Sequence, residues 1–241
     1  MSLVVVIPAY NASRHLPDVL ARVGKTPEVA RIVVVDDGST DDTAACVRAL
    51  ASTLSTSACP VTLVERPRNG GYGAAMRDGL RAARRDAPDV VACVHADGQY
   101  SPEALPALLA ELRARRLDLL QGSRIASGTA RSGGMPLYKI AANAVLNRLE
   151  NWTLGLGMTD YHSGYLLYGR RALALPLETL SSSFDFDLEV IATARAHGLA
   201  VGEAPVPTRY ADEESHLQPI TYGLRVLRVL WNYRRGHYDP I

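Results

Sequence analysis

The sequence has little of what marks a nucleic-acid binder, a disulfide scaffold or a membrane span. Its 241 residues carry 26 basic and 25 acidic side chains, a net charge of +1, so no nucleic-acid partner is expected. The three cysteines, Cys46, Cys59 and Cys93, fit no zinc or haem spacing and are expected as buried free thiols. No apolar run reaches the roughly 18 residues of a membrane span, and residues 3–7 make too short a core for a secretory signal. We expect a cytoplasmic protein, at most peripheral on the inner face of a membrane.

The rest of the composition is that of an ordinary globular chain. Hydrophobic residues make up 47% and charged residues 21%, and this length allows one substantial core. Short apolar runs, typical of strands buried on both faces, alternate with segments of helical apolar spacing. The expected strands are residues 3–7, 31–35, 61–65, 90–95, 117–122 and 201–210, and the expected helices are 12–23, 40–54, 73–85, 102–116, 137–154, 185–197 and 222–233.

This alternation predicts an α/β protein with a Rossmann-like, mostly parallel sheet, helices on both faces and a single domain. In such sheets, ligands bind beyond the carboxyl ends of the strands. Three polar segments, residues 8–11, 36–39 and 96–99, each follow an expected strand directly. We therefore expect a ligand site at that edge of the sheet, lined by these segments.

Two common nucleotide-binding motifs are absent from the sequence. The dinucleotide fold needs glycines in the first strand–helix turn, but residues 8–11 read Pro-Ala-Tyr-Asn. The glycine cluster at residues 70–73 lacks the Lys-Ser/Thr ending of a Walker loop. These absences argue against a dehydrogenase and against an NTPase, and a tight turn into a helix is the simplest interpretation of the glycine cluster.

A carboxylate and an amide oxygen, from Asp97 and Gln99, follow the fourth expected strand two residues apart. Oxygen ligands are the ones that Mg²⁺ and Mn²⁺ prefer, and such an ion bridging a diphosphate neutralises charge on a leaving group. Alone, the Asp-Gly pair at residues 97–98 is also an ordinary turn. The pair becomes informative only together with the other segments.

Five segments in order resemble the signatures of family 2 glycosyltransferases with the GT-A fold. They read VVIPAYN (5–11), VVDDGSTD (34–41), NGGYGAA (69–75), HADGQ (95–99) and GSR (122–124). The likeness runs from residue 3 to about residue 210, and the nearest branch resembles the dolichyl-phosphate mannosyltransferases and polyprenyl-phosphate glycosyltransferases. The resemblance implies a GT-A-like domain that moves one sugar, with inversion and with Mg²⁺ or Mn²⁺, from a UDP- or GDP-linked donor.

The resemblance leaves the acceptor open. A polyprenyl or dolichyl phosphate is the first expectation. A soluble or protein-bound hydroxyl is the alternative, and a non-catalytic nucleotide- or lipid-binding relative is a third. In this scheme residues 1–124 form the nucleotide-sugar-binding half, 125–221 the acceptor-side half, and 222–241 a C-terminal amphipathic helix and tail. A homodimer is left open.

The resemblance also implies roles for residues on the donor side. Asp36 would hydrogen-bond the base, Asp37 would steady that loop, and Arg124 would meet a phosphate through its planar fork of donors. Asp97 and Gln99 would contact the metal and the diphosphate. The remaining residues assigned to nucleotide-sugar binding are Pro8, Ala9, Tyr10, Asn11, Asn69, Gly70 and Ala96.

On the acceptor side, residues 160–165 (DYHSGY) resemble the family's acceptor block. Asp160 is the candidate base for a hydroxyl acceptor, whereas beside a lipid phosphate it would orient the sugar; a structural cap is the simpler alternative. His162, Ser163 and Lys139 are further candidates for this side.

The sequence departs from the family at two positions, and its C-terminal helix has two interpretations. His95 stands where the family has Asp, so it binds metal, binds phosphate or has no chemical role. Leu166 replaces the usual Arg after Gly-Tyr, which weakens the transfer of an acceptor contact to that position. Arginines and apolar residues alternate at helical spacing over residues 222–235. That pattern suits either an interfacial helix on anionic lipid or an ordinary surface helix.

Overall fold

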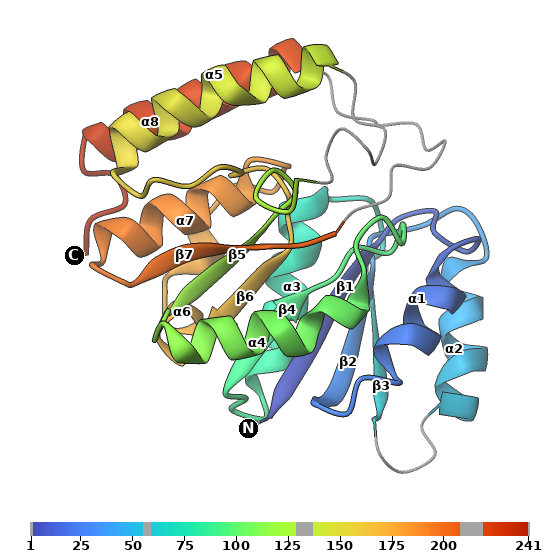
Figure 1. Cartoon of the computed structure of the whole chain (residues 1–241). Helices are drawn as coiled ribbons and strands as arrows, with labels where there is room; N and C mark the ends of the chain where they lie inside the picture. Colours follow the sequence, from blue (N-terminus) through green and yellow to red (C-terminus); the bar gives the residue numbers. More distant parts are fainter. Residues whose placement is uncertain (1, 55–58, 129–136, 208–218, 241) are drawn as a thin grey trace.

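One sheet carries the fold in the computed structural model, which describes residues 2–54, 59–128, 137–207 and 219–240. Within these ranges the sheet has seven strands (Figure 1). β6 is antiparallel to both of its neighbours, and the other pairings are parallel. The order across the sheet is β3 (Val61–Glu65), β2 (Val29–Asp36), β1 (Leu3–Ala9), β4 (Val90–Cys93), β6 (Leu166–Gly169), β5 (Leu119–Ser123) and β7 (Val201–Pro205).

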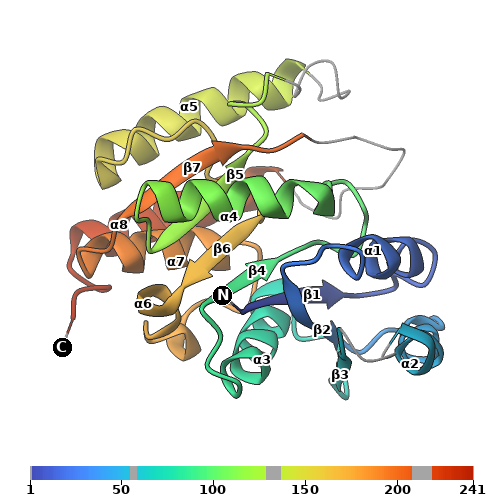
Figure 2. The same ribbon diagram turned by 60° about the horizontal axis from the view of Figure 1, so that its bottom comes forward.

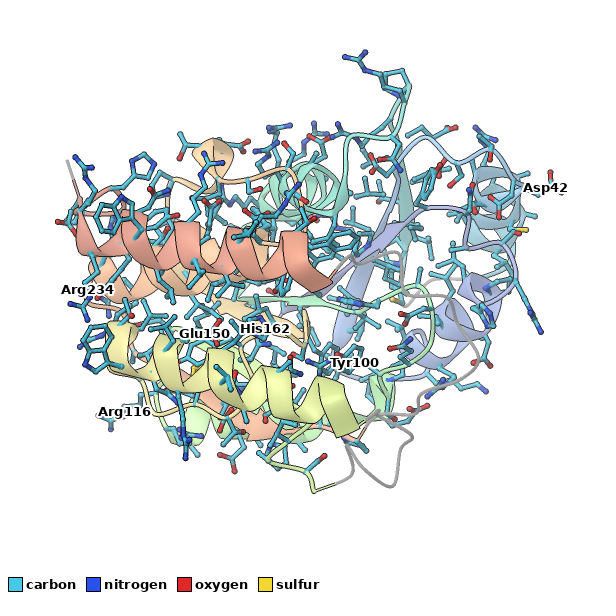
Figure 3. The ribbon with its side chains drawn as sticks, turned by 90° about the horizontal axis from the view of Figure 1, so that it is seen from above. Asp42, Tyr100, Arg116, Glu150, His162 and Arg234 are labelled. Atoms are coloured by element: carbon cyan, nitrogen blue, oxygen red, sulfur yellow. The ribbon has the colours of Figure 1, made fainter. Side chains whose placement is uncertain are left out.

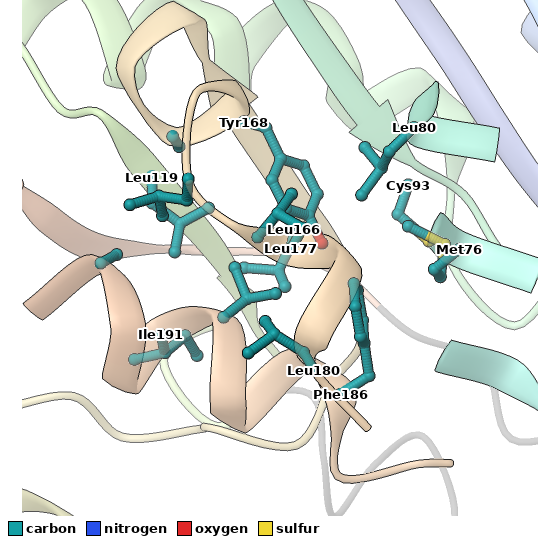
Figure 4. Close-up of a cluster of buried hydrophobic side chains, with 14 of the residues drawn as sticks. Met76, Leu80, Cys93, Leu119, Leu166, Tyr168, Leu177, Leu180, Phe186 and Ile191 are labelled. Atoms are coloured by element: carbon teal, nitrogen blue, oxygen red, sulfur yellow. The ribbon is translucent and has the colours of Figure 1, made fainter. Parts of the chain in front are cut away.

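The central strands are apolar throughout because both faces of the sheet are covered. In β1, Val4 and Val6 belong to the hydrophobic cluster on one face, and Leu3, Val5 and Ile7 belong to the cluster on the other. Figure 4 shows the first cluster where Met76, Leu80 and Phe186 meet the sheet residues Leu166 and Tyr168. The continuous apolar runs in the sequence therefore correspond to strands that are buried on both faces of the sheet.

Helices cover both faces of the sheet. α1 (Leu16–Val23), α2 (Thr43–Leu54) and α4 (Leu105–Ala114) pack on one face, and α3 (Tyr72–Arg84) and α7 (Phe186–Ala196) pack on the other. Figure 2 shows α3 and α4 on opposite sides of the sheet. The short elements are η1 (Pro102–Ala104), α6 (Arg170–Leu173) and η2 (Leu177–Thr179).

Two long helices, α5 (Leu137–Leu154) and α8 (Pro219–Arg234), form an outer layer beyond α7. They lie side by side at the top of Figure 1, and the view from above in Figure 3 agrees. α8 contacts both α7 and α5, and buries Val226, Val229 and Leu230 in the same cluster as α7. On the opposite face of α8, Leu224, Leu227 and Trp231 are exposed to solvent.

The structure confirms the predicted α/β class, with some changes in the elements. α2 begins at Thr43, three residues later than expected, and β7 ends at Pro205 instead of residue 210. β6 was not predicted as a strand, because four residues are too few for a periodic pattern. Its insertion between β4 and β5 brings the chain before Leu166 to the edge where β1 and β4 end. The three cysteines are free thiols, with Cys59 and Cys93 buried and Cys46 half-buried.

Candidate active site

The loops after β1 and β2 are joined at the carboxyl edge of the sheet, the upper edge in Figure 1. Ala9 pairs with Asp36 across the two strands, and the peptide N–H of Asp37 donates to the carbonyl of Ala9 at 2.8 Å. Both carboxylates are buried. Asp36 accepts a hydrogen bond from Ser39 N (3.2 Å), which closes the turn after its strand.

The loop after β1 presents an exposed aromatic ring. Tyr10 is 46% exposed, and its neighbour Asn11 adopts a positive φ of 50°. The Asn11 side chain accepts a hydrogen bond from Thr40 N at 2.8 Å, which fastens this loop to the one after β2. Because the ring is exposed and its loop is fixed, Tyr10 can stack against a nucleobase. Pro8 and Ala9 lie within β1, and Ala9 is buried.

Asp37 holds the glycine turn in place. Its Oδ1 accepts from Gly70 N (2.9 Å) and pairs with Arg66 Nε (2.8 Å), and its Oδ2 accepts from Gly71 N (2.9 Å). Gly71 has φ +93°, and a Cβ there would lie 2.4 Å from the carbonyl oxygen of Ser182. The turn therefore needs glycine for its backbone and for the close packing of the chain before α7. The neighbouring Asn69 side chain is exposed.

The loop after β4 carries the predicted metal-binding residues. Val94 N donates to Val6 O (3.0 Å), so this loop leaves the sheet beside β1. Asp97 is half-buried and accepts a hydrogen bond from Gln99 N at 2.9 Å. Gln99 is also half-buried, and Ala96 is buried beneath the loop. Asp97 thus offers its carboxylate at the same edge as Asp36.

His95 makes its contacts within the protein. Its Nε2 lies 3.2 Å from the carbonyl oxygen of Gly164, and its ring packs against Tyr72 and Tyr100, with centroids 5.7 and 5.3 Å away. Gly164 has φ +72°, and a Cβ there would lie 2.5 Å from that Nε2. His95 therefore joins the loop after β4 to the acceptor-side block.

The donor set around Asp97 fits only a metal that the substrate helps to bind. In the parts of the chain that the structure describes, no group of three or more His, Cys, Asp or Glu side chains is placed to hold a metal ion. Mg²⁺ commonly keeps several waters and binds through one or two carboxylates plus substrate phosphates. Asp97 can supply such a single carboxylate, with the Gln99 amide beside it.

On the acceptor side, Asp160 and Arg124 form a buried, two-pronged ion pair. Arg124 follows β5, and its Nε and Nη2 donate to Asp160 Oδ2 (2.7 Å) and Oδ1 (2.9 Å). The backbone N–H groups of Arg124 and His162 donate to the same carboxylate at 3.2 and 3.0 Å. Asp160 is only 1% exposed.

These contacts set the protonation state of Asp160. Burial alone would raise its pKa, but the charge of the Arg124 guanidinium and the hydrogen bonds it donates hold the pKa below its usual value. A carboxylate of lowered pKa is a weak proton acceptor. The geometry therefore favours an orienting role over the role of a base.

Polar side chains from β5 and β7 anchor the block that carries Asp160. Glu203 on β7 accepts hydrogen bonds from Thr159 N (2.8 Å), Thr159 Oγ1 (3.0 Å) and Asp160 N (3.2 Å). The hydroxyl of Ser163 accepts a hydrogen bond from the Gln121 side chain. Ser163 is 2% exposed, so its hydroxyl serves the internal structure.

A second carboxylate, missed by sequence reasoning, lies in the first turn of α7. Asp187 is buried and accepts a hydrogen bond from the Tyr72 hydroxyl at 2.8 Å. Desolvation raises the pKa of Asp187 to about 7, and the Tyr72 hydrogen bond only partly opposes it. A Cβ on Gly164 would lie 3.3 Å from Asp187 Oδ2, so the side chain adjoins the acceptor block.

The structure thus gathers most of the predicted site residues at one edge. Asp36 ends β2 there, Asp97 follows β4 and Arg124 follows β5. The contact of His95 with Gly164 links the loop after β4 to the block that precedes β6. The side chain of Lys139 lies outside the described residues. The functional candidates that the sequence did not reveal are Asp187, Glu203, Glu150 and Tyr222; Asp187 sits in an acidic first turn of a predicted helix, which was the one local signal.

Comparison with known proteins identifies the family. Residues 4–175 match glycosyl transferase family 2. The chain belongs to this family. That membership confirms the predicted resemblance and the prediction of a glycosyltransferase.

Individual relatives agree with the family assignment. The chain is 32% identical to a polyprenol monophosphomannose synthase of Mycolicibacterium smegmatis over 84% of this chain and 75% of the relative. It is 29% identical to an undecaprenyl-phosphate mannosyltransferase of Micrococcus luteus, over 89% and 85% of the two chains. A glucosyl-3-phosphoglycerate synthase from Mycobacterium tuberculosis, solved with Mn²⁺, UDP and glucosyl-3-phosphoglycerate, aligns with a TM-score of 0.67 and 20% identity, over 100% and 81%. This last likeness confirms the predicted GT-A-like fold.

Proposed function

We propose that the protein transfers one sugar, with inversion, from a UDP- or GDP-linked donor to a polyprenyl phosphate, using a divalent cation. The observation that carries the proposal is the contact of His95 with Gly164, which joins the loop after β4 to the acceptor block. The names of the mannosyl-transferring relatives specify polyprenyl carriers, which supports this acceptor. The UDP and Mn²⁺ in the related fold support the donor and the cation.

The donor would lie across the ends of β1, β2 and β4. Tyr10 would stack on the base, Asp36 would accept hydrogen bonds from it, and the turn at Asn69 and Gly70 would border the nucleotide. Asp97, with Gln99 beside it, would hold the divalent cation. When bound, the cation neutralises charge on the departing diphosphate. Asp37 would act indirectly, by fixing the glycine turn.

The transfer itself needs little proton chemistry when the acceptor is a phosphate. A phosphate oxygen forms the new bond to the anomeric carbon, while the bond from that carbon to the donor diphosphate breaks and the electron pair leaves with the diphosphate. Because this nucleophile is already anionic, no base is required. The lowered pKa of Asp160 suits such a reaction, in which Asp160 and Arg124 orient the sugar and the phosphate.

A hydroxyl acceptor is the second candidate, and Asp187 favours it. A hydroxyl must lose its proton during attack, and a general base works best with a pKa near the operating pH. Burial raises the pKa of Asp187 to about 7, within that range. Asp187→Asn would then abolish transfer to a hydroxyl, whereas transfer to a phosphate would continue.

The decisive experiment is a transfer assay with labelled UDP- and GDP-sugars and Mn²⁺. Wild-type protein is offered undecaprenyl phosphate, dolichyl phosphate or the corresponding polyprenols in vesicles, and the lipid extract is analysed for a glycosyl phosphate. We expect product from at least one phosphate and none from the polyprenols. Product formed only on free hydroxyls would favour the second candidate, and donor binding without turnover would mean that the chain is not a catalyst.

The outer face of α5 and α8 supports a reaction at a membrane surface. No described helix is long and apolar enough to cross a membrane. α8 contains no acidic residue, and the single acid of α5, Glu150, is buried. Arg234 lies 4.0 Å above the ring of Trp152, so the exposed stripes of the two helices adjoin. The exposed apolar residues are Val145, Trp152, Leu224, Leu227 and Trp231, and the exposed cations are Arg148, Arg228, Arg234 and Arg235.

Exposed tryptophan beside arginine is typical of surfaces that rest on lipid headgroups. Each arginine near an anionic surface contributes roughly 1 kcal/mol, so Arg228→Gln with Arg235→Gln should weaken binding by about 2 kcal/mol, roughly 30-fold. Sedimentation with anionic vesicles measures this, with neutral vesicles and the distant variant Arg85→Gln as controls. An unchanged partition coefficient would contradict the membrane proposal.

A further inference from the structure

Three side chains from separate segments meet beneath the outer helix layer: those of Glu150 and His162 are buried and that of Tyr222 is half-buried. His162 of the acceptor block lies between Glu150 of α5 and Tyr222 of α8, with its Nε2 3.2 Å from Glu150 Oε1 and its Nδ1 2.9 Å from the Tyr222 hydroxyl. The rings of His162 and Tyr222 meet edge to face, with centroids 5.4 Å apart. Figure 3 shows Glu150 and His162 between the two helices. We call this group the Glu–His–Tyr cluster.

Burial favours one order of hydrogens within the cluster. The side chains of Glu150 and His162 are 0% and 6% exposed. Among the described residues, neither oxygen of Glu150 nor Nε2 of His162 has another hydrogen-bond partner, so the carboxylate 3.2 Å away favours the tautomer with its hydrogen on Nε2. In the neutral imidazole, Nδ1 then accepts the hydrogen bond that the Tyr222 hydroxyl donates. The imidazole is thus held at both nitrogens.

The cluster is linked to the ion pair of the acceptor side through the His162 backbone. The backbone N–H of His162 donates to Asp160 Oδ1 at 3.0 Å, and the other oxygen of that carboxylate accepts from Arg124 Nε at 2.7 Å. A shift of His162 therefore moves a donor of the Asp160 carboxylate. The imidazole itself makes its contacts away from that carboxylate, with Glu150 and Tyr222.

We propose that Glu150, His162 and Tyr222 are positioning residues for sugar transfer: they hold the Asp160–Arg124 pair in its reactive geometry. The inference rests on the proposed function, since it assigns that pair to the reacting sugar and acceptor. It gives the outer layer a role in the chemistry, because two of the three residues come from α5 and α8. Neither Glu150 nor Tyr222 contacts the donor in this scheme.

The test compares variants that remove one contact at a time. Tyr222→Phe removes only the hydroxyl and leaves Nδ1 without its donor, so kcat should fall roughly tenfold, the loss expected for one unsatisfied buried group. The KM for the nucleotide-sugar should stay within about twofold, because ground-state donor binding is untouched. Tyr233→Phe, a half-buried tyrosine of the same helix, is the matched control and should keep wild-type kcat.

Glu150 provides a conservative rescue. Glu150→Gln keeps an acceptor oxygen beside Nε2, so its kcat should stay near wild type, whereas Glu150→Leu should lose about as much as Tyr222→Phe. Thermal unfolding of every variant shows whether the fold is intact. If Tyr222→Phe folds and keeps wild-type kcat, or if Tyr233→Phe loses as much, the positioning role is wrong.

Two further readouts separate this inference from the proposed function. The imidazole ¹⁵N spectrum of His162 should show a hydrogen on Nε2 and a changed Nδ1 signal in Tyr222→Phe, whatever the acceptor is. Slow hydrolysis of the donor by water also needs the sugar oriented, so its rate should fall in the same variants without any lipid. If wild type transfers nothing to polyprenyl phosphate while hydrolysis still follows the cluster, the acceptor proposal fails and the positioning role stands. A hydrolysis rate equal in all variants overturns the positioning role.

Discussion

Asp37→Asn should loosen the glycine turn, because the carboxylate makes three contacts and an amide cannot keep all of them. Its oxygens accept from Gly70 N and Gly71 N and pair with Arg66 Nε, all within 2.9 Å. An amide keeps one accepting oxygen and turns an NH₂ group toward the other peptide N–H. A hydrogen bond to a charged group contributes about 1.5–3 kcal/mol, so the loss of one, with a donor facing a donor, should cost about 3 kcal/mol.

The cost should be visible in unfolding and in nucleotide binding. For a chain of this size, about 3 kcal/mol corresponds to a fall in Tm of roughly 6–12 °C. Urea unfolding measures the change in the free energy of unfolding. Calorimetric titration with UDP and GDP measures the Kd of each nucleotide, which should rise if the turn borders the nucleotide.

Asp78→Asn is the matched control for this change. Asp78 pairs with the same Arg66 and also with Arg81, and its side chain is 24% exposed. Because each exposed ion pair is worth at most about 1 kcal/mol, the loss of both should cost at most about 2 kcal/mol. Equal destabilisation by Asp37→Asn and Asp78→Asn would refute the reasoning, because the loss would then belong to the arginine and not to the turn.

The remaining predictions concern the other carboxylates. Asp97→Asn should abolish Mn²⁺-dependent turnover while Tm stays within a few degrees, and retained turnover would remove Asp97 from the metal site. Glu203→Gln should lower kcat less than Glu203→Ala, since the amide oxygen still accepts from Thr159; equal losses would deny the anchoring role. Folding raises the pKa of Asp187 from its usual value near 4 to about 7, so the folded state favours its protonated form. The unfolding free energy should therefore fall by up to about 4 kcal/mol between pH 4 and pH 7, and Asp187→Asn should remove this dependence in urea unfolding.

The sequence predicts well those parts of the fold whose signal is local. The buried strand at residues 3–7 is a continuous apolar run, and the polar segments after the strands at Asp36 and Asp97 mark the edge where ligands bind. β6 escapes this kind of reasoning because it is short and joins the sheet between two strands from elsewhere in the chain. Its position depends on long-range pairing, which no window of residues contains.

The candidate site likewise has residues with a local sequence signal and residues that only long-range folding brings together. The donor-side residues stand in compact motifs, so their types and spacing announce them. The surroundings of Asp160 come instead from distant segments: Arg124 follows β5, Glu203 is on β7, and Glu150 reaches it through His162. A sequence pattern can name Asp160 as a candidate, but the pKa of that carboxyl depends on an arginine 36 positions away.

The two buried carboxyls of the acceptor side show why the environment decides their chemistry. Asp160 and Asp187 are both nearly inaccessible to solvent. Asp160 receives a guanidinium and two backbone N–H groups and stays ionised. Asp187 accepts a hydrogen bond from the uncharged Tyr72 hydroxyl, and burial raises the pKa of Asp187 to about 7. Opposite pKa shifts in two carboxyls of one site are the usual means by which that site provides both an ion and a proton carrier. Asp160 is therefore suited to hold charge in place and Asp187 to exchange a proton, so the assignment of a base at Asp160 that the family resemblance suggests is the weaker of the two on physical grounds.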